Sequence, residues 1–362
     1  METFPFANGK GAGFLRVTLT QVAQRAGVSL ASASRALNGE SASARTVERV
    51  AQAAKDLAYV PDARAQSLKL GTTRQLSFAV ADVGNHVYVE MLRAVEDAVR
   101  EDGYRVLISS TGSAIAAEIE LLQSLQRGYA DGLIISPLRI DDDLLAELSG
   151  LRIPAVVIGN LPRDAQQDNV RANSAAGMQL AVRHLADLGR RRIGFINGPL
   201  DTTPGQVRGR AFWPPAGKRG WPPRPATESW PTTSPSKRGH RRRGRCSIAG
   251  EELDAVLAAN DLIAAGVYHA AFDRGWQIPE QLAVVGMDDS ALASQMHPTL
   301  TSVNLGSAAR GRWAAELLLS RLRDPDRPIQ RIVVEPELVV RRSTDGPAPQ
   351  SPTRPSTMEA RL

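Results

Sequence analysis

The stretch "VTLTQVAQRAGVSLASASRALNG", residues 17–39, decides the fold of the first domain. Thr18 and Gln21 form a T-x-x-Q capping box, which predicts the start of a helix. Gly27 accepts the left-handed conformation and therefore predicts the end of that helix. Ser29 is a good N-cap for a second helix. Two helices joined by a short glycine turn predict a helix-turn-helix motif.

Apolar residues at helical spacing predict a small core for these helices. The apolar face of the first helix consists of Leu19, Val22, Ala23 and Ala26. A third helix is predicted over residues 45–59, and its apolar face consists of Val47, Val50, Ala51, Ala54 and Leu57. The three helices would enclose one core, so the bland alternative is a helical bundle with no DNA-binding role.

The second helix, Leu30–Leu37, carries side chains that suit DNA. Leu30 and Ala31 lie at its N-terminal end, which enters the major groove in such motifs, so thymine methyl groups are their expected targets. Arg35 follows one turn later and can bind guanine O6 and N7 together. The short polar side chains suited to phosphate oxygens are Thr18, Ser29, Ser34 and Asn38. The pattern favours a DNA-binding domain over an inert bundle.

The next residues strengthen this interpretation. Residues 17–38 contain the short motifs V-T-L, V-A, A-G-V-S, S-R and L-N. The chain then continues with "YVPDARAQSLKLG", residues 59–71. Together they resemble the headpiece and hinge of the lac repressor (LacI/GalR) family. The resemblance implies a short hinge helix over Ala63–Lys69, with Ala65 and Leu68 as DNA contacts. Leu68 would insert into the minor groove at the operator centre and kink it.

From residue 75 onward, short apolar runs alternate with helical patterns. The predicted strands are "QLSFAVAD" (75–82), "RVLISST" (105–111), "DGLIISP" (131–137), "PAVVIGN" (154–160), "RRIGFING" (191–198), "LDAVLAAND" (253–261) and "LAVVGMDD" (282–289). The predicted helices are residues 89–101, 115–126, 175–188 and 262–274. Such alternation predicts parallel sheets covered on both faces, with a ligand site at the carboxyl ends of the strands. Several of these runs end in polar residues, which are candidate ligand contacts. Loops are polar in any protein, so an ordinary strand end is the alternative for each. These residues are Asp82, Ser136, Asn160, Asn260–Asp261 and Asp288–Asp289.

This part of the chain also resembles the lac repressor family, through "DGLIISP", "VRGRAF" (207–212), "AANDLIAAGV" (258–267) and "VVGMDDS" (284–290). The resemblance implies a periplasmic-binding-protein-like α/β core of two doubly wound subdomains. The effector contacts that it carries over are Tyr88, Ser136, Arg208, Asn260 and Asp288. A bidentate arginine and a carboxylate in a cleft suit a polyhydroxylated or charged small molecule, and a sugar or related polyol is the expected effector. Ala172-Asn173 departs from the usual Asp-Asn pair, which removes a carboxylate near the cleft.

The segment "ARGRWAAELLLSRL", residues 309–322, predicts an amphipathic helix with Trp313, Leu317 and Leu318 facing the core. The resulting domain boundaries are a disordered leader (1–16), a helix-turn-helix domain (17–61), a hinge helix and linker (62–73), an effector-binding core (74–342) and a disordered tail (343–362). Within the core, the expected first subdomain takes residues 74–171 and 307–334, and the second takes residues 172–303 and 335–342.

The basic character of the chain resides in one unusual window. The chain has 44 Lys and Arg against 38 Asp and Glu, a net charge of +6. Residues 213–247 hold nine of the basic residues, one acidic residue and seven prolines, but no Val, Ile, Leu, Met or Phe. Without this window, 35 basic and 37 acidic residues remain. Bulk charge therefore says little about the partner that the rest of the chain binds.

Three interpretations of this window compete. A basic arm could bind phosphate and stack bases on its tryptophans. A proline-rich surface insertion would be disordered. A frame-shifted segment, over about residues 213–248, would replace an expected helix, strand and helix, and it is favoured because family pattern stops at Phe212 and resumes by about Ala249 without extra length. Losing that unit removes on the order of ten buried side chains of about 1.5–3 kcal/mol each, so the second subdomain is expected to be loosened.

The sequence thus predicts a cytoplasmic transcriptional regulator, a repressor that binds a near-palindromic duplex operator as a homodimer and a sugar-like effector between two subdomains. The alternatives are a sugar-binding protein without regulatory DNA binding, or the inactive product of a frame-shifted regulator gene. No catalytic pairing, metal-ligand spacing or cofactor motif is visible, so neither an enzyme, a cofactor nor a metal is expected. No apolar run is long enough to predict a membrane helix.

Overall fold

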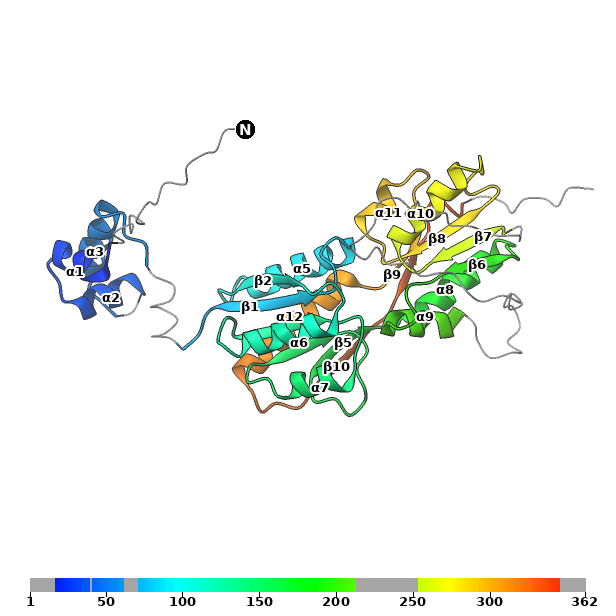
Figure 1. Ribbon diagram of the computed structural model, residues 1–362. Coiled ribbons are helices and arrows are strands. Elements are labelled where there is room, and N and C mark those ends of the chain that lie inside the picture. The colour runs from blue at the N-terminus through cyan, green and yellow to red at the C-terminus, as the bar shows by residue number, and fades with distance from the viewer. Residues whose placement is uncertain (1–16, 40, 62–70, 213–252, 346–362) are drawn as a thin grey trace, which may run out of the picture. The chain divides into compact units, whose positions relative to one another are not determined.

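The computed structural model describes residues 17–39, 41–61, 71–212 and 253–345 (Figure 1). It divides into a first unit that ends at Thr73 and a second unit that begins at Arg74. Several predictions lie outside the described residues: the leader, the hinge helix with Ala65 and Leu68, the window at 213–248, and the tail beyond residue 345.

The first unit consists of α1 (Leu19–Ala26), α2 (Leu30–Leu37) and α3 (Ala44–Asp56). The capping box is present, because the Thr18 backbone N–H donates to Gln21 Oε1 at 2.8 Å and Thr18 Oγ1 accepts from the Gln21 N–H. Gly27 ends α1 in the left-handed conformation with φ of 60°. Ser29 Oγ accepts from the Ser32 N–H at 3.1 Å and caps α2. The predicted helix-turn-helix is confirmed.

The core of the first unit lies where the three helices meet. Its fully buried members are Val22, Ala23, Ala26, Ala33, Ala36, Val50 and Ala53. The predicted face of α3 was wrong in part, because Val47 and Ala51 are exposed whereas Ala53 is buried. Val50, Ala53 and Leu57 also repeat at helical spacing, and this stripe is the one that packs against α1 and α2.

The second unit contains two lobes, each built around one sheet, which Figure 1 shows with helices on both faces. The sheet of the first lobe has the strand order β10-β5-β4-β3-β1-β2, and all its pairs are parallel. Its strands are β1 (Gln75–Val80), β2 (Arg105–Ser110), β3 (Gly132–Ser136), β4 (Ala155–Ile158), β5 (Asp168–Ala172) and β10 (Arg331–Val334). One face is covered by α5 (His86–Val99) and α12 (Ser307–Arg323), the other by α6 (Ile115–Leu125) and α7 (Asp142–Ser149).

The sheet of the second lobe has the order β11-β9-β8-β7-β6, with only β11 antiparallel. Its strands are β6 (Ile193–Ile196), β7 (Ala255–Ala258), β8 (Ala283–Met287), β9 (Thr301–Asn304) and β11 (Glu337–Val339). Its helices are α8 (Ser174–Asp187) and α9 (Thr203–Phe212) on one face, and α10 (Asp261–Phe272) and α11 (Ala291–Gln295) on the other. The two doubly wound sheets confirm the predicted fold class. The expected loosening of this lobe stays a prediction, and limited proteolysis is the measurement that checks it.

The chain crosses between the lobes three times, from β5 to α8, from β9 to α12 and from β10 to β11. Two of these crossings are joined by Asn173 Nδ2, which donates to Glu335 Oε2 at 2.9 Å. At the third crossing, Asn304 Nδ2 donates at 3.1 Å to Asp289 Oδ2, which follows β8. Because β5 and β10 form one edge of the first sheet and β9 and β11 one edge of the second, all three crossings lie on the same side of the unit. We call this side the hinge of the second unit; it is separate from the hinge helix predicted over Ala63–Lys69.

Helix α12 packs along α5 through small residues. A Cβ built on Gly311 would lie 2.5 Å from the Met91 carbonyl oxygen, so only glycine permits this approach. Ala314, Ala315 and Leu318 continue the buried face, whereas Trp313 is 44% exposed. The prediction that Trp313 faces the core was therefore wrong, and the predictions for Leu317 and Leu318 are confirmed. The close contact runs along the small side chains, and the bulky indole lies on the opposite side of the helix.

Candidate functional sites

The predicted DNA-reading side chains lie on the surface of α2. Leu30 is 51% exposed, and Ala31 and Arg35 are also exposed, whereas Ala33 and Ala36 on the opposite face are buried. The helix is thus anchored by two small residues and presents three side chains outward. An arginine beside two apolar groups can distinguish guanine from thymine by hydrogen bonding and methyl contact.

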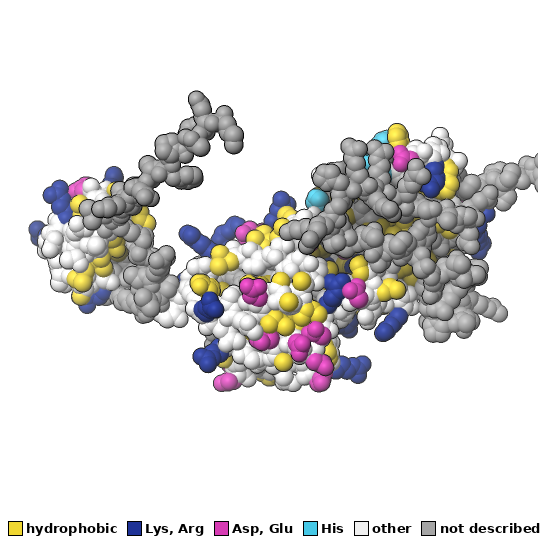
Figure 2. Space-filling view, viewed as in Figure 1, with side chains coloured by type: hydrophobic (Ala, Val, Ile, Leu, Met, Phe, Trp, Pro, Cys, Tyr) yellow, Lys and Arg dark blue, Asp and Glu magenta, His cyan; other side chains and the backbone are white. Residues whose placement is uncertain are grey.

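The polar side chains predicted to contact phosphate lie around α2, and most of them face solvent. The predicted phosphate contacts Thr18, Ser29 and Asn38 are exposed, and Ser34 is partly buried. Residues 17–61 carry five basic and three acidic side chains, and Figure 2 shows basic side chains on the surface of this unit. The small positive excess suits a phosphate backbone.

The turn before α2 is held by α3. Arg49 Nη2 donates to the Gly27 carbonyl oxygen at 3.3 Å, and Arg25 pairs with Asp56 at 3.6 Å. These exposed contacts add to the buried core through which α3 packs against α1 and α2. The orientation of α2 therefore depends on a third helix that presents no predicted base contact itself.

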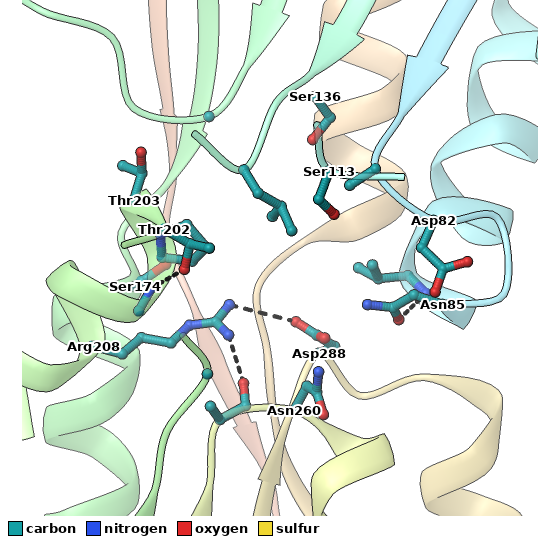
Figure 3. Close-up of a pocket in the computed structure, with 18 of the residues that line it drawn as sticks. Asp82, Asn85, Ser113, Ser136, Ser174, Thr202, Thr203, Arg208, Asn260 and Asp288 are labelled. Carbon is teal, nitrogen blue, oxygen red and sulfur yellow. Dashed lines mark hydrogen bonds and ion pairs between the residues drawn. The ribbon is translucent and has the colours of Figure 1, made fainter. Parts of the chain in front are cut away.

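A cavity of about 670 Å³ lies between the lobes of the second unit, at the carboxyl ends of both sheets. This is where doubly wound sheets bind ligands. All five predicted effector contacts line it: Tyr88, Ser136, Arg208, Asn260 and Asp288. Figure 3 shows Arg208, Asp288 and Asn260 together on the second-lobe side, with Ser136 facing them from the first lobe. Their contact with an effector stays a prediction.

Arg208 and Asp288 form the charged centre of the cavity. Arg208 Nη1 donates to the Ala259 carbonyl oxygen at 2.6 Å, and Nη2 lies 3.8 Å from Asp288 Oδ1. Burial raises the pKa of Asp288 to about 6, while the nearby Arg208 opposes that rise and Asp261 adds to it. The carboxylate is therefore the charged form at neutral pH, ready to accept hydrogen bonds from hydroxyl groups.

Arg310, from the first turn of α12, is a second cation in the cavity wall that the sequence interpretation missed. Burial lowers its pKa to about 10, which Asp288 opposes, so the guanidinium still carries its charge at neutral pH. Arg139 and Arg171 also line the cavity and were missed. Each occurs in a stretch whose sequence reads as loop or solvent-facing helix, so no local signal marked them.

Two neutral side chains complete the polar lining. Burial raises the pKa of Tyr88 to about 12, which keeps its hydroxyl protonated beside its hydrogen-bond partner Ser136. Asn260 Oδ1 caps α10 by accepting from the Ile263 N–H at 2.8 Å, so its amide is held in place. Donors and acceptors that alternate around one cavity suit a molecule with several hydroxyl groups.

The other strand-end residues divide into two groups. Asp82 and Asn160 line the cavity, as predicted for the carboxyl edge of the sheet. Asp261 and Asp289 are outside the lining. Asp261 Oδ2 accepts from Ser290, and Asp289 pairs with Arg341 at 2.7 Å. These two carboxylates hold loops together below the cavity.

Among the described residues, no cluster of three or more His, Cys, Asp or Glu side chains could hold a metal ion. The same part of the chain contains no helix with the length and apolar character needed to cross a membrane.

Comparisons with known proteins agree with both units. Residues 18–62 match the bacterial regulatory proteins of the lacI family, and residues 182–344 match the periplasmic binding protein-like domain. The ribose operon repressor of Escherichia coli strain K12 is 31% identical over 330 residues, which cover 90% of this chain and 99% of that repressor. A transcriptional repressor of Haemophilus influenzae, PurR, is 28% identical over 90% of this chain and 98% of its own length.

Solved structures extend the likeness to the fold. The lac repressor dimer bound to operator and an anti-inducer matches with a TM-score of 0.74 at 24% identity, over 91% of this chain and 99% of that one. The transcriptional regulator CelR in complex with cellobiose matches with a TM-score of 0.59 at 26% identity, over 91% of this chain and all of that one. With its helix-turn-helix, its two-lobed core and a relative of this similarity, the chain belongs to the lacI family of bacterial regulatory proteins, which are DNA-binding transcriptional regulators.

Proposed function

We propose that this protein is a sequence-specific transcriptional repressor whose affinity for an operator is controlled by a small polyhydroxylated effector in the cavity. The observation that carries the proposal is the convergence of Tyr88, Ser136, Arg208, Asn260 and Asp288 from both lobes on one cavity, in a chain whose first unit is a helix-turn-helix. The relatives named for ribose and cellobiose support a sugar as the effector class. The chain acts by binding, and its relatives are regulators rather than enzymes.

The operator is near-palindromic because the active form is a homodimer. Strand β2 is the edge of the first sheet away from the lobe crossings, and it presents Leu107 and Ile108, which are 42% and 44% exposed. Unpaired edge strands with apolar side chains tend to be covered by another chain. A second copy on this edge would give a dimer with two headpieces, which is what two half-sites require.

The effector acts by linkage. Because its contacts come from both lobes, it binds best to one relative arrangement of the lobes, and a DNA-competent dimer that prefers a different arrangement would lose operator affinity. The reverse preference would make the effector a corepressor. The sign is read directly from operator affinity with and without effector.

The test is a binding selection of the full-length protein from a random duplex library, followed by affinity measurements on the enriched sequence. The expected result is an enriched near-palindrome. D-ribose and cellobiose are then tested as effectors by calorimetry and by their change in operator affinity, with Asp288→Ala as the control that should lose the response. No enrichment with either the full chain or an artificially dimerised headpiece would defeat the proposal. Enrichment with the headpiece alone would favour the inactive, frame-shifted product.

A further inference from the structure

The two lobes touch at a second place, away from the hinge. Arg139 follows β3 in the first lobe and Asp201 follows β6 in the second. Arg139 Nη2 lies 2.7 Å from Asp201 Oδ2, and Nε donates to the same oxygen at 2.9 Å. Beside this pair, the Thr203 backbone N–H donates to the Leu138 carbonyl oxygen at 2.8 Å. An ion pair and a hydrogen bond thus join the lobes side by side, between the loop after β3 and the segment that leads from β6 into α9.

The position of these contacts follows from the sheet order. The hinge crossings lie on the β9 and β11 edge of the second sheet, and β6 is the opposite edge. The loop after β6 is therefore on the far side of the cavity from the hinge, and Pro199, Thr202 and Thr203 from this loop line the cavity, as do Leu138 and Arg139. Figure 3 shows Thr202 and Thr203 at one side of the cavity, across from Asp82 and Asn85.

The loop after β6 is held by internal hydrogen bonds. Thr202 Oγ1 donates to the Pro199 carbonyl oxygen at 2.6 Å, and Asn197 Nδ2 donates to the Gly205 carbonyl oxygen at 2.8 Å. A Cβ on Gly205 would lie 2.1 Å from that Pro199 oxygen, so glycine is required for the turn. These contacts hold the turn that carries Asp201, so rotation of one lobe against the other would make or break its contact with Arg139.

Arg139 is also tied into its own lobe. Its Nη1 donates at 2.9 Å to the carbonyl oxygen of Ser113, which follows β2 and lines the cavity. One side chain thus joins the loops after β2, β3 and β6. We propose that Arg139 and Asp201 form a latch that sets the fraction of closed molecules and so the rate at which a ligand leaves the cavity.

The size of the effect is bounded by exposure. The Asp201 side chain is 65% exposed and that of Arg139 is 29% exposed, so solvent screens the pair. Exposed pairs of this kind change an equilibrium by roughly two- to fivefold. Because the Thr203 hydrogen bond remains, removing the ion pair should raise the ratio of open to closed molecules by about this factor without abolishing closure.

The experiment measures the distance between the lobes in the full-length protein by pulsed electron paramagnetic resonance. Nitroxide labels are placed at Arg127→Cys and Asp273→Cys, both exposed, with the native Cys246 changed to Ser. Asp201→Ala and Arg139→Ala should each increase the long-distance fraction about two- to fivefold. The double variant should match the single variants, because each removes the same contact.

The matched control is Arg323→Ala, which removes an exposed ion pair to Asp102 inside the first lobe and should leave the distance distribution unchanged. Exchanging the charges, with Arg139→Asp and Asp201→Arg together, should recover part of the closed fraction that either reversal alone loses. Unchanged distances in both alanine variants would overturn the proposal, as would shifts that simply add in the double variant.

A second readout is the dissociation rate of D-ribose, which the latch variants should increase by the same factor. This arm rests on the proposed function, whereas the distance arm does not. If D-ribose fails to bind while the distances shift as expected, the latch stands and the sugar proposal fails. If D-ribose binds and neither its dissociation rate nor the distances respond, the latch is refuted and the proposed function stands.

Discussion

Replacing Gly311 with alanine tests whether the close packing of α12 on α5 holds the first lobe together. The added methyl group would lie 2.5 Å from the Met91 carbonyl oxygen and 3.0 Å from its Cα. Both atoms belong to the backbone, so the clash cannot be relieved by a side-chain rotation and the two helices must separate. Overpacking of this kind costs about 1–3 kcal/mol.

The intrinsic effect of the substitution has the opposite sign, because alanine in a helix is favoured over glycine by about 0.5–1 kcal/mol. Gly266→Ala isolates that effect, since Gly266 is exposed on α10 and nothing lies within 4 Å of the added Cβ. Gly266→Ala should therefore be neutral or slightly stabilising, and Gly311→Ala destabilising by about 1–3 kcal/mol. Urea denaturation followed by circular dichroism measures both, with an unchanged m-value as the check on two-state behaviour. Equal midpoints for the two variants would show that the helices do not meet as described.

Three further predictions follow from particular side chains. Arg35→Ala should reduce discrimination between the selected operator and a variant at the contacted guanine by about 1–3 kcal/mol, measured as a ratio of dissociation constants; an unchanged ratio would remove Arg35 as a base reader. Burial raises the pKa of Glu118 to about 7 from an ordinary value near 4.5, so the folded protein binds the extra proton and loses stability as pH rises through this interval. Glu118→Gln should flatten that decline and gain up to about 3 kcal/mol over the parent above pH 7 in denaturant titrations, and parallel curves for the two proteins would contradict this. Asp168→Ala removes the buried partner of Arg321 and Arg327 and should cost about 3–5 kcal/mol, whereas a thermal midpoint within a degree of the parent would show that the cluster is not needed.

The sequence predicted those elements that local chemistry determines. The caps of α1 and α2 rest on side chains within three residues of the backbone groups they satisfy, so Thr18, Gly27 and Ser29 could be interpreted without any tertiary information. The seven predicted strands were all found because each contains a short run of Val, Ile, Leu, Ala or Phe, and most of these runs are buried in a parallel sheet. Strand β2 was found although its side chains are partly exposed at the sheet edge.

One of the missed strands, β5, differs in composition. Strand β5 has the sequence DNVRA, and its Asp168 and Asn169 are buried with polar partners. Asp168 pairs with two arginines, and Asn169 donates to the Val157 carbonyl oxygen at 2.8 Å. Strands β9, β10 and β11 have three or four residues each and lie at the hinge. Strand β5 satisfies its surroundings with hydrogen bonds and ion pairs and so leaves no apolar run to detect, whereas the polar composition of β5 does not explain why the apolar β10 was missed.

The cavity was predicted partly from residues at strand ends and partly from the family resemblance, which supplied Tyr88 on α5 and Arg208 on α9. Its missed member Arg310 carries neither signal. Arg310 belongs to the helix after β9, and only the crossing of the chain at the hinge brings it to the carboxyl end of β8. Three-dimensional topology decides this placement, whereas the local pattern around Arg310 is that of an ordinary amphipathic helix.

The close contact between α5 and α12 explains why packing and ligand binding should be coupled in this protein. Tyr88 and Met91, one turn apart on α5, both line the cavity, and Met91 is also the residue that Gly311 contacts. On α12, Arg310 lines the cavity and Gly311 is its neighbour. A ligand that contacts Tyr88 and Arg310 therefore touches both helices of the pair directly beside their closest approach. Separating these helices with Gly311→Ala should change effector affinity as well as stability, and Gly266→Ala should change neither by more than its small helical effect. Affinity that is lost only in proportion to the unfolded fraction would show that the helix pair supports the cavity without transmitting its occupancy.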